Sequence, residues 1–229
     1  TERDLLQKQA DINRLKEILV LDRQWVTYPD YNDRAGWDRF LGTFKDEYIR
    51  RGEKRLNYQW QVVKATDYLA FERTGNRQIM EKPFGANNGA IADLLMAELA
   101  EGKGRFVDQL INGVFNACEM TSWALAAHII VQPSHRALPA YDYPVIDLTS
   151  GDLGGLLAWT YHFMRPSFDK VDPEISRRLR HELQTRILDP YMNNDSFWWM
   201  GRNYNGRMLN NWNPWCNSNA LMCFMLLED

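Results

Sequence analysis

The chain has 229 residues, of which 45% are hydrophobic and 25% charged, as expected for a globular protein with a sizeable core. Its net charge is −3 and no basic block stands out, which argues against nucleic acid as a partner. No apolar run approaches the roughly 18 residues of a membrane span, and no signal peptide opens the chain. We therefore expect neither a nucleic-acid nor a membrane partner.

Apolar residues spaced by three and four predict helices throughout the first half. Four such patterns precede residue 102; they cover 5–19, 37–49, 56–71 and 91–99. Gly75 and Gly102 stand where C-caps of the third and fourth helices belong, and Asn88 with Gly89 marks the expected start of the fourth. An apolar stretch from Phe106 to Ile130 predicts one long buried helix or two.

Three prolines interrupt the pattern between residues 132 and 148, which predicts a long ordered loop. Helical spacing resumes over 151–164. Asp172 and Pro173 then form a helix start, with Asp as N-cap and Pro at the first position, and that helix is expected to reach about Tyr191. A last apolar helix is expected from Ala220 to Leu227.

No segment has the alternation typical of a strand, so the fold class expected is all-α. Successive helix pairs within one domain, residues 1–229, fit a bundle, a solenoid or an α/α toroid of antiparallel helical hairpins. The final apolar helix has no cap before Asp229. We therefore expect the chain to be a fragment of a longer protein.

Cysteine and histidine spacing predicts no metal site. The three Cys form no CxxC pair, and their apolar surroundings predict buried free thiols. The four His lack a metal-ligand spacing such as HExxH, and no cofactor is expected.

Two runs near the C-terminus, 197–204 and 210–219, are the main functional clue, because together they hold four of the nine Trp and six Asn. Flat aromatic rings with amide groups between them suit the binding of sugar rings, and an amide binds a carboxylate without adding charge. The platform candidates are Trp198, Trp199, Trp212 and Trp215. The amide candidates are Asn210, Asn211 and Asn213; the alternative is that these Asn side chains cap the backbone before the final helix.

Other residues suit proton transfer or ligand contact. Tyr204 lies two residues after Arg202, whose guanidinium would stabilise a phenolate. Glu119 stands in a nearly uncharged helix one turn before Trp123, so it either pairs with an Arg or faces a cavity. His135, in the proline-rich loop, is a candidate acid or base, whereas His128 and His162 fit satisfied core histidines.

The run Asn210-Asn211-Trp212-Asn213, followed by Cys216 and an apolar helix, resembles the signature of heparinase II/III-like polysaccharide lyases. So does Glu119-x-x-x-Trp123 followed by Pro133-Ser134-His135. The resemblance lies with the N-terminal helical part of that family and covers most of the chain loosely. Lyases of this broad group often carry His directly after the paired Asn, where this chain has Trp212.

The resemblance implies an incomplete α/α toroid in an exported, periplasmic or secreted enzyme that also has β-sandwich domains. The substrate would be a uronate-containing polysaccharide such as heparin or heparan sulfate, cleaved by β-elimination without a cofactor. Asn210 and Asn211 would neutralise the carboxylate, and Tyr204 and His135 would exchange protons. Glu119, Trp123 and Arg202 would contact the substrate. The isolated chain is then expected to be inactive or very weak.

Two other functions fit the residues. An α/α-barrel glycoside hydrolase needs two carboxylates at a fixed separation, which Glu119 with Asp142, Asp147 or Asp152 would supply. A non-catalytic carbohydrate-binding helical module would need only the tryptophans. A hydrolase would differ from a lyase in giving a product without a double bond. A binding module would differ in that substitutions of Tyr204 and His135 would change nothing.

Overall fold

The computed structural model describes residues 8–20, 25–201 and 210–228, and within these ranges the chain forms helices and no strand. The all-α prediction is confirmed for this part of the chain. The first half contains α2 (Ile12–Ile18), α3 (Arg34–Leu41), η1 (Gly42–Phe44), α4 (Lys45–Glu53), α5 (Ala65–Thr74), α6 (Gln78–Glu101) and α7 (Val107–Glu119). The second half contains η2 (Ile129–Val131), α8 (Leu148–Val171), α9 (Pro173–Leu183), η3 (Gln184–Leu188), α10 (Asp189–Asn193), η4 (Trp198–Met200) and α11 (Trp212–Leu227).

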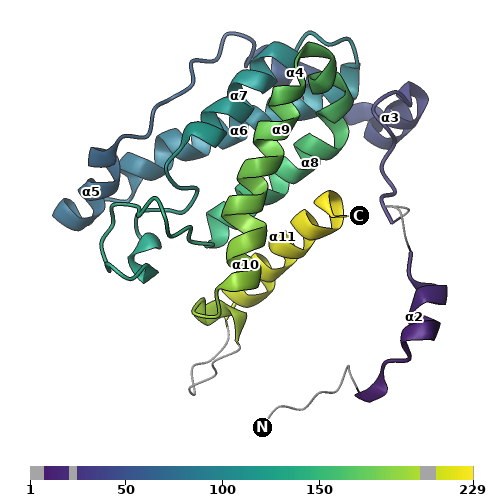
Figure 1. Cartoon of the computed structure of the whole chain (residues 1–229). Coiled ribbons are helices and arrows are strands. Elements are labelled where there is room, and N and C mark those ends of the chain that lie inside the picture. The colour runs from purple at the N-terminus through teal and green to yellow at the C-terminus, as the bar shows by residue number, and fades with distance from the viewer. Residues whose placement is uncertain (1–7, 21–24, 202–209, 229) are drawn as a thin grey trace.

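Two long helices organise the body of the molecule (Figure 1). α6 packs against α4, α5 and α7, whereas α8 packs against α9 on one side and α11 on another. A continuous cluster of buried side chains joins them, from Trp37 in α3 to Leu227 in α11. α2 stands apart from this body in Figure 1, and none of its residues is buried.

Several predicted helix ends are confirmed. Gly75 and Gly102 adopt the left-handed conformation directly after α5 and α6, as their lack of a Cβ allows. Asp172 caps α9 by accepting a hydrogen bond from the Glu174 amide, and Pro173 takes the first helical position, where no donor is needed.

Three predicted boundaries are wrong. α6 begins at Gln78 and continues through Asn88 and Gly89. The Asn87 side chain helps to explain why the helix continues here. It exchanges hydrogen bonds with the Gln61 backbone, at 2.8 and 3.0 Å, so it does not compete for the backbone hydrogen bonds of α6. The long apolar helix stops at Glu119, and the last helix begins at Trp212 instead of Ala220.

The end of α7 is held by arginines from α9 and η3. Arg178 and Arg186 donate to the Cys118 carbonyl, each at 3.3 Å, which satisfies a backbone acceptor at the helix C-terminus. Each also donates its Nε–H to the Glu182 carboxylate, Arg178 at 2.8 Å and Arg186 at 2.5 Å. These two arginines therefore join the end of α7 to α9 and η3.

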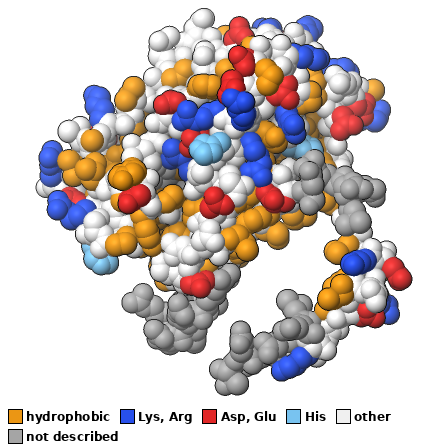
Figure 2. All heavy atoms as spheres, in the orientation of Figure 1, with side chains coloured by type: hydrophobic (Ala, Val, Ile, Leu, Met, Phe, Trp, Pro, Cys, Tyr) orange, Lys and Arg blue, Asp and Glu red, His pale blue; other side chains and the backbone are white. Residues whose placement is uncertain are grey.

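Charged and apolar side chains are distributed differently over the surface (Figure 2). Acidic and basic side chains intermix over the face of α9, and hydrophobic side chains gather along the lower edge, where Figure 1 places α11. On α11, Trp215, Leu221 and Met225 are exposed. No helix in the described ranges is long and apolar enough to cross a membrane.

Candidate functional site

The paired asparagines lie at the start of α11 and both are exposed. Asn210 uses one side-chain oxygen as a cap, accepting a hydrogen bond from the Trp212 amide at 3.0 Å. Asn211 makes no side-chain bond within the described part of the chain, so its amide is available to a ligand. Asn213 turns inward and donates to the Trp199 carbonyl at 2.6 Å, so it positions the preceding segment.

The tryptophans divide into exposed and buried members. Trp198 and Trp212 are half-buried and lie 5.3 Å apart between ring centroids at 41°. Trp215 is 43% exposed and donates its indole N–H to Asp152 at 2.6 Å. By contrast, Trp199 and Trp123 are 1% and 2% exposed, so neither offers a ring face to a sugar. Trp198, Trp212 and Trp215 remain as platform candidates.

A shallow depression follows the exposed side of the first turns of α11. Asn211, Trp215, Ser218 and Asn219 line it together with Pro214. A flat indole bordered by amides and a hydroxyl is the arrangement that sugar rings require, with apolar contact and hydrogen bonds on the same surface.

An Asp–His pair lies next to this site and was not assigned a function from the sequence. His128 Nδ1 and Asp147 Oδ2 are 2.6 Å apart, and the His128 ring packs edge-on against Trp212 with centroids at 4.7 Å. The His128 side chain is 14% exposed and Asp147 is fully buried. The prediction of a satisfied core histidine is thus correct about its hydrogen bond but misses its position beside Trp212.

Asp147 is fixed by donors from two segments. It is the N-cap of α8 and accepts hydrogen bonds from the Ser150 amide at 2.8 Å and the Leu125 amide at 3.1 Å. The Ser150 hydroxyl accepts from the Asp147 amide in return, completing a capping box. The spacing of Asp147 and Ser150 is visible in the sequence; the approach of His128 depends on the loop before it.

Arg77 completes this group from the start of α6. Its Nη2 lies 3.4 Å from His128 Nε2, and its Nε bonds Glu81 at 2.6 Å. The arginine side chain is 45% exposed. His128 contacts Trp212 and Arg77 contacts His128, so a histidine and a cation lie close to the residue that directly follows the exposed Asn210–Asn211 pair. Such groups suit an anionic sugar better than a neutral one.

Glu119 lies outside this site. It is exposed at the last position of α7 and forms an ion pair with Arg178 Nη1 at 3.3 Å. Of the two possibilities given above, an Arg partner or a cavity, the structure therefore shows the Arg partner. Because α7 ends at Glu119, Trp123 does not lie one helical turn further along. Trp123 instead donates its indole N–H to the Ala117 carbonyl at 2.8 Å, within the core.

His135 occupies an exposed turn of the loop between η2 and α8. Its φ of 52° is unusual for a residue other than glycine, and its Nδ1 lies 3.2 Å from the Ile130 carbonyl. No hydrogen bond, ion pair or ring contact within the described ranges links it to the α11 site. Tyr204 and Arg202 lie outside the described residues, so their positions remain predictions.

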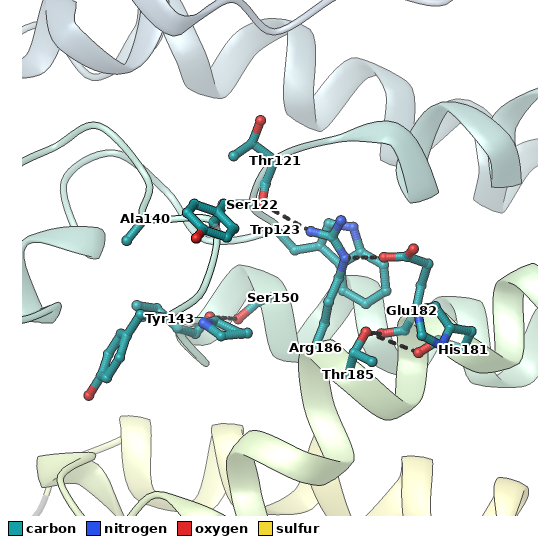
Figure 3. A pocket seen from close by; sticks show the side chains of 13 residues that line it. Thr121, Ser122, Trp123, Ala140, Tyr143, Ser150, His181, Glu182, Thr185 and Arg186 are labelled. Atoms are coloured by element: carbon teal, nitrogen blue, oxygen red, sulfur yellow. Dashed lines mark hydrogen bonds and ion pairs between the residues drawn. The ribbon is translucent and has the colours of Figure 1, made fainter.

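A separate polar cavity of about 250 Å³ lies between the 121–123 segment, the 140–145 loop and the α9–η3 helix. Figure 3 shows Arg186 across Trp123, with its guanidinium directed toward Thr121 and Glu182. All three guanidinium nitrogens donate within the protein. Among the described residues, the arginine at the wall of this cavity is therefore committed to a structural network.

Three of the four carboxylates considered for a hydrolase are bonded to groups of the protein itself. Glu119 is bound to Arg178, Asp147 is buried at the α8 cap, and Asp152 accepts hydrogen bonds from Trp215 and Asn219. Cys118, Cys216 and Cys223 are free and buried, as predicted. Within the described ranges, no group of three His, Cys, Asp or Glu side chains is arranged to hold a metal ion.

Comparison with known proteins gives no relative: no protein-family model matches the chain, and no curated protein matches it significantly.

Proposed function

We propose that this chain is the helical part of a polysaccharide lyase that cleaves uronate-containing glycosaminoglycans such as heparan sulfate by β-elimination. The observation that carries the proposal is the exposed Asn210–Asn211 pair at the start of α11, bordered by Trp198, Trp212 and Trp215. The proposal includes an incomplete toroid of helical hairpins and a periplasmic or secreted location.

Elimination demands stabilisation of charge next to a carboxylate. Removing the proton beside the uronate carboxyl group places a second negative charge on that group. Neutral amides and the N-terminus of a long helix stabilise such an enolate-like state by hydrogen bonds and by the helix dipole. The Asn211 amide and Nδ2 of Asn210, neither of which bonds another described residue, would supply such hydrogen bonds.

The residues around the amides favour elimination over hydrolysis. A hydrolase uses one protonated and one ionised carboxyl group on opposite sides of the bond. The carboxylates near α11 are Asp147 and Asp152, and both are held by protein donors. The basic groups at the site are instead Arg77 and His128, which suit carboxylate binding and proton removal.

Product analysis tests the proposal. The protein, in the full length its gene encodes, is incubated with heparan sulfate, and absorbance of the carbon–carbon double bond conjugated to the carboxylate is followed. We expect this band to appear in the full-length protein and to fall by about 10²-fold or more in Asn210→Ala/Asn211→Ala, since each lost oxyanion donor costs about 10²–10³ in kcat. Shortened chains that lack the double bond would establish hydrolysis, and unshortened chains would leave only binding.

A further inference from the structure

The tautomer of His128 follows from its two neighbours. Asp147 has only acceptor oxygens, and its carboxylate is already oriented by the Leu125 and Ser150 amides. The imidazole nitrogen 2.6 Å from Asp147 Oδ2 must therefore carry the proton, which makes it Nδ1–H. In the neutral ring, Nε2 is then the unprotonated nitrogen.

The second neighbour agrees with this assignment. Arg77 Nη2, 3.4 Å from His128 Nε2, belongs to a guanidinium that can only donate hydrogen bonds. The Arg77 guanidinium therefore faces the lone pair of His128 Nε2. A buried carboxylate that orients an imidazole and leaves its Nε2 unprotonated is the arrangement that makes histidine a general base.

Two charged side chains contact the imidazole, Asp147 at Nδ1 and Arg77 at Nε2. Glu81 bonds the other side of Arg77. Asp152 acts together with Asp147 on Cys216, and Arg186 and Asp67 act together with Asp147 on Tyr68. Burial, with a smaller contribution from Asp147, raises the pKa of the Cys216 thiol to about 12. Burial also raises the pKa of the Tyr68 phenol. The positive charge of Arg186 lowers this pKa, whereas the negative charges of Asp147 and Asp67 raise it further. His128 is thus held between one acidic partner, Asp147, and one basic partner, Arg77.

We propose that His128 is the general base of the α11 site, that Asp147 is its positioning residue, and that Arg77 covers His128 Nε2 until a carboxylate ligand draws the guanidinium away. This rests on the proposed lyase function. Arg77 is suited to such a movement because 45% of its side chain is exposed and its Nη1 makes no hydrogen bond within the described residues.

The chemical step balances without a cofactor. His128 Nε2 takes the proton from C5 of the uronate, and the C5–H electron pair becomes the C4–C5 double bond. The C4–O bond breaks, its electron pair stays on the leaving oxygen, and water protonates that oxygen. The imidazolium formed is stabilised by Asp147 and later returns its proton to solvent.

The arrangement also provides selectivity for acidic sugars. A neutral sugar has no anionic group to compete with His128 for Arg77, so Nε2 stays covered. A uronate carboxylate offers the guanidinium a charge-assisted, two-point contact that an imidazole lone pair cannot match. The base is then uncovered only when the correct class of substrate is bound.

Nitrogen-15 NMR of the histidine side chains tests the proposal in the chain itself. The probes are a heparan sulfate tetrasaccharide and the same tetrasaccharide with its uronate carboxyls reduced to alcohols. We expect the Nδ1–H tautomer in the free chain, a saturable change at His128 Nε2 with the acidic probe, and none with the reduced probe. Saturable shifts at the Asn211 amide with an unchanged His128 Nε2 would overturn the base assignment alone. If neither probe binds, both the base assignment of His128 and the proposed lyase function fail.

Substitutions separate a catalytic from a structural role. His128→Gln keeps an N–H donor for Asp147 but has no basic nitrogen. In the full-length protein we expect kcat to fall by about 10²–10⁴-fold, with KM and melting temperature nearly unchanged, because that is the range for loss of a general base. His181→Gln, on the solvated side of α9, is the matched control and should leave kcat unchanged. Full activity in His128→Gln would show that this histidine only supports Asp147.

Arg77 variants give the second readout. Arg77→Met removes the cation and also uncovers His128 Nε2. We expect KM for heparan sulfate to rise at least tenfold, while turnover at saturation changes far less, and Arg77→Lys should recover part of the lost affinity. An unchanged KM in Arg77→Met would remove Arg77 from the mechanism.

Discussion

Asp147 illustrates how one side chain organises its surroundings. In the sequence it appeared as one of three carboxylates available to a hydrolase. In the fold it is fully buried and binds the Leu125 amide, the Ser150 amide and His128. A buried carboxylate with this many donors is committed to hydrogen bonds within the protein. Its role is to hold the start of α8 and the orientation of His128 together.

The buried thiols make stability depend on alkaline pH. Burial raises the pKa of Cys118, Cys216 and Cys223 to about 12 each, from about 9 for a solvent-exposed thiol. Between pH 9 and pH 12 the unfolded chain therefore loses thiol protons that the folded chain keeps. Proton release on unfolding means that the contribution of these thiols to stability is constant below about pH 9 and falls as the pH rises through this window.

Urea unfolding at pH 7 and pH 10 measures this effect. We expect each thiol to lower the free energy of unfolding by about 1 kcal/mol at pH 10 relative to pH 7, following the linkage relation. In Cys223→Ala, the fall in the free energy of unfolding between pH 7 and pH 10 should be smaller by the contribution of one thiol. This holds whatever the substitution does to stability at pH 7. An identical pH dependence in the two proteins would show that this thiol titrates normally.

At the scale of single helices, apolar periodicity identified helices correctly but misplaced several ends. The helix over 212–219 was missed because Asn and Trp are poor helix formers. In the fold, Asn210 caps the first turn and Pro214 stands in it, where a missing N–H costs nothing. The break after Glu119 has the opposite cause: the arginines that cap α7 come from distant α9 and η3.

Helix packing gives a direct prediction at two glycines. A Cβ on Gly52 in α4 would lie 2.2 Å from Ala97 Cβ in α6, whereas a Cβ on Gly85 in α6 would meet no atom within 4 Å. Gly52→Ala should lower the free energy of unfolding by about 1–3 kcal/mol through overpacking. Gly85→Ala should raise it by about 0.5–1 kcal/mol, because alanine is the better helix former. Urea titration of both variants checks the contrast, and equal destabilisation would contradict the close α4–α6 packing.

For the whole molecule, the sequence predicted the all-α class and the long loop before α8, but not the helix contacts that build the site. The Trp/Asn segment was identified by composition alone, yet composition does not distinguish buried Trp199 from exposed Trp215. His128 and Arg77 carry no local signal, because they lie 51 residues apart and meet only through the packing of α6, the η2 loop and α11. The toroid arrangement remains a prediction.

The central claim is that the start of α11 recognises a uronate carboxylate. The most direct test is calorimetric titration of the chain with a heparan sulfate tetrasaccharide and with its carboxyl-reduced form. We expect saturable binding of the acidic form, weakened at least about tenfold by carboxyl reduction and by Asn211→Ala, because a hydrogen bond to a charged group contributes about 1.5–3 kcal/mol. Asn112→Ala, at an exposed amide on α7, should bind like the unsubstituted chain. Equal affinity for the acidic and reduced forms, or no effect of Asn211→Ala, would contradict the claim.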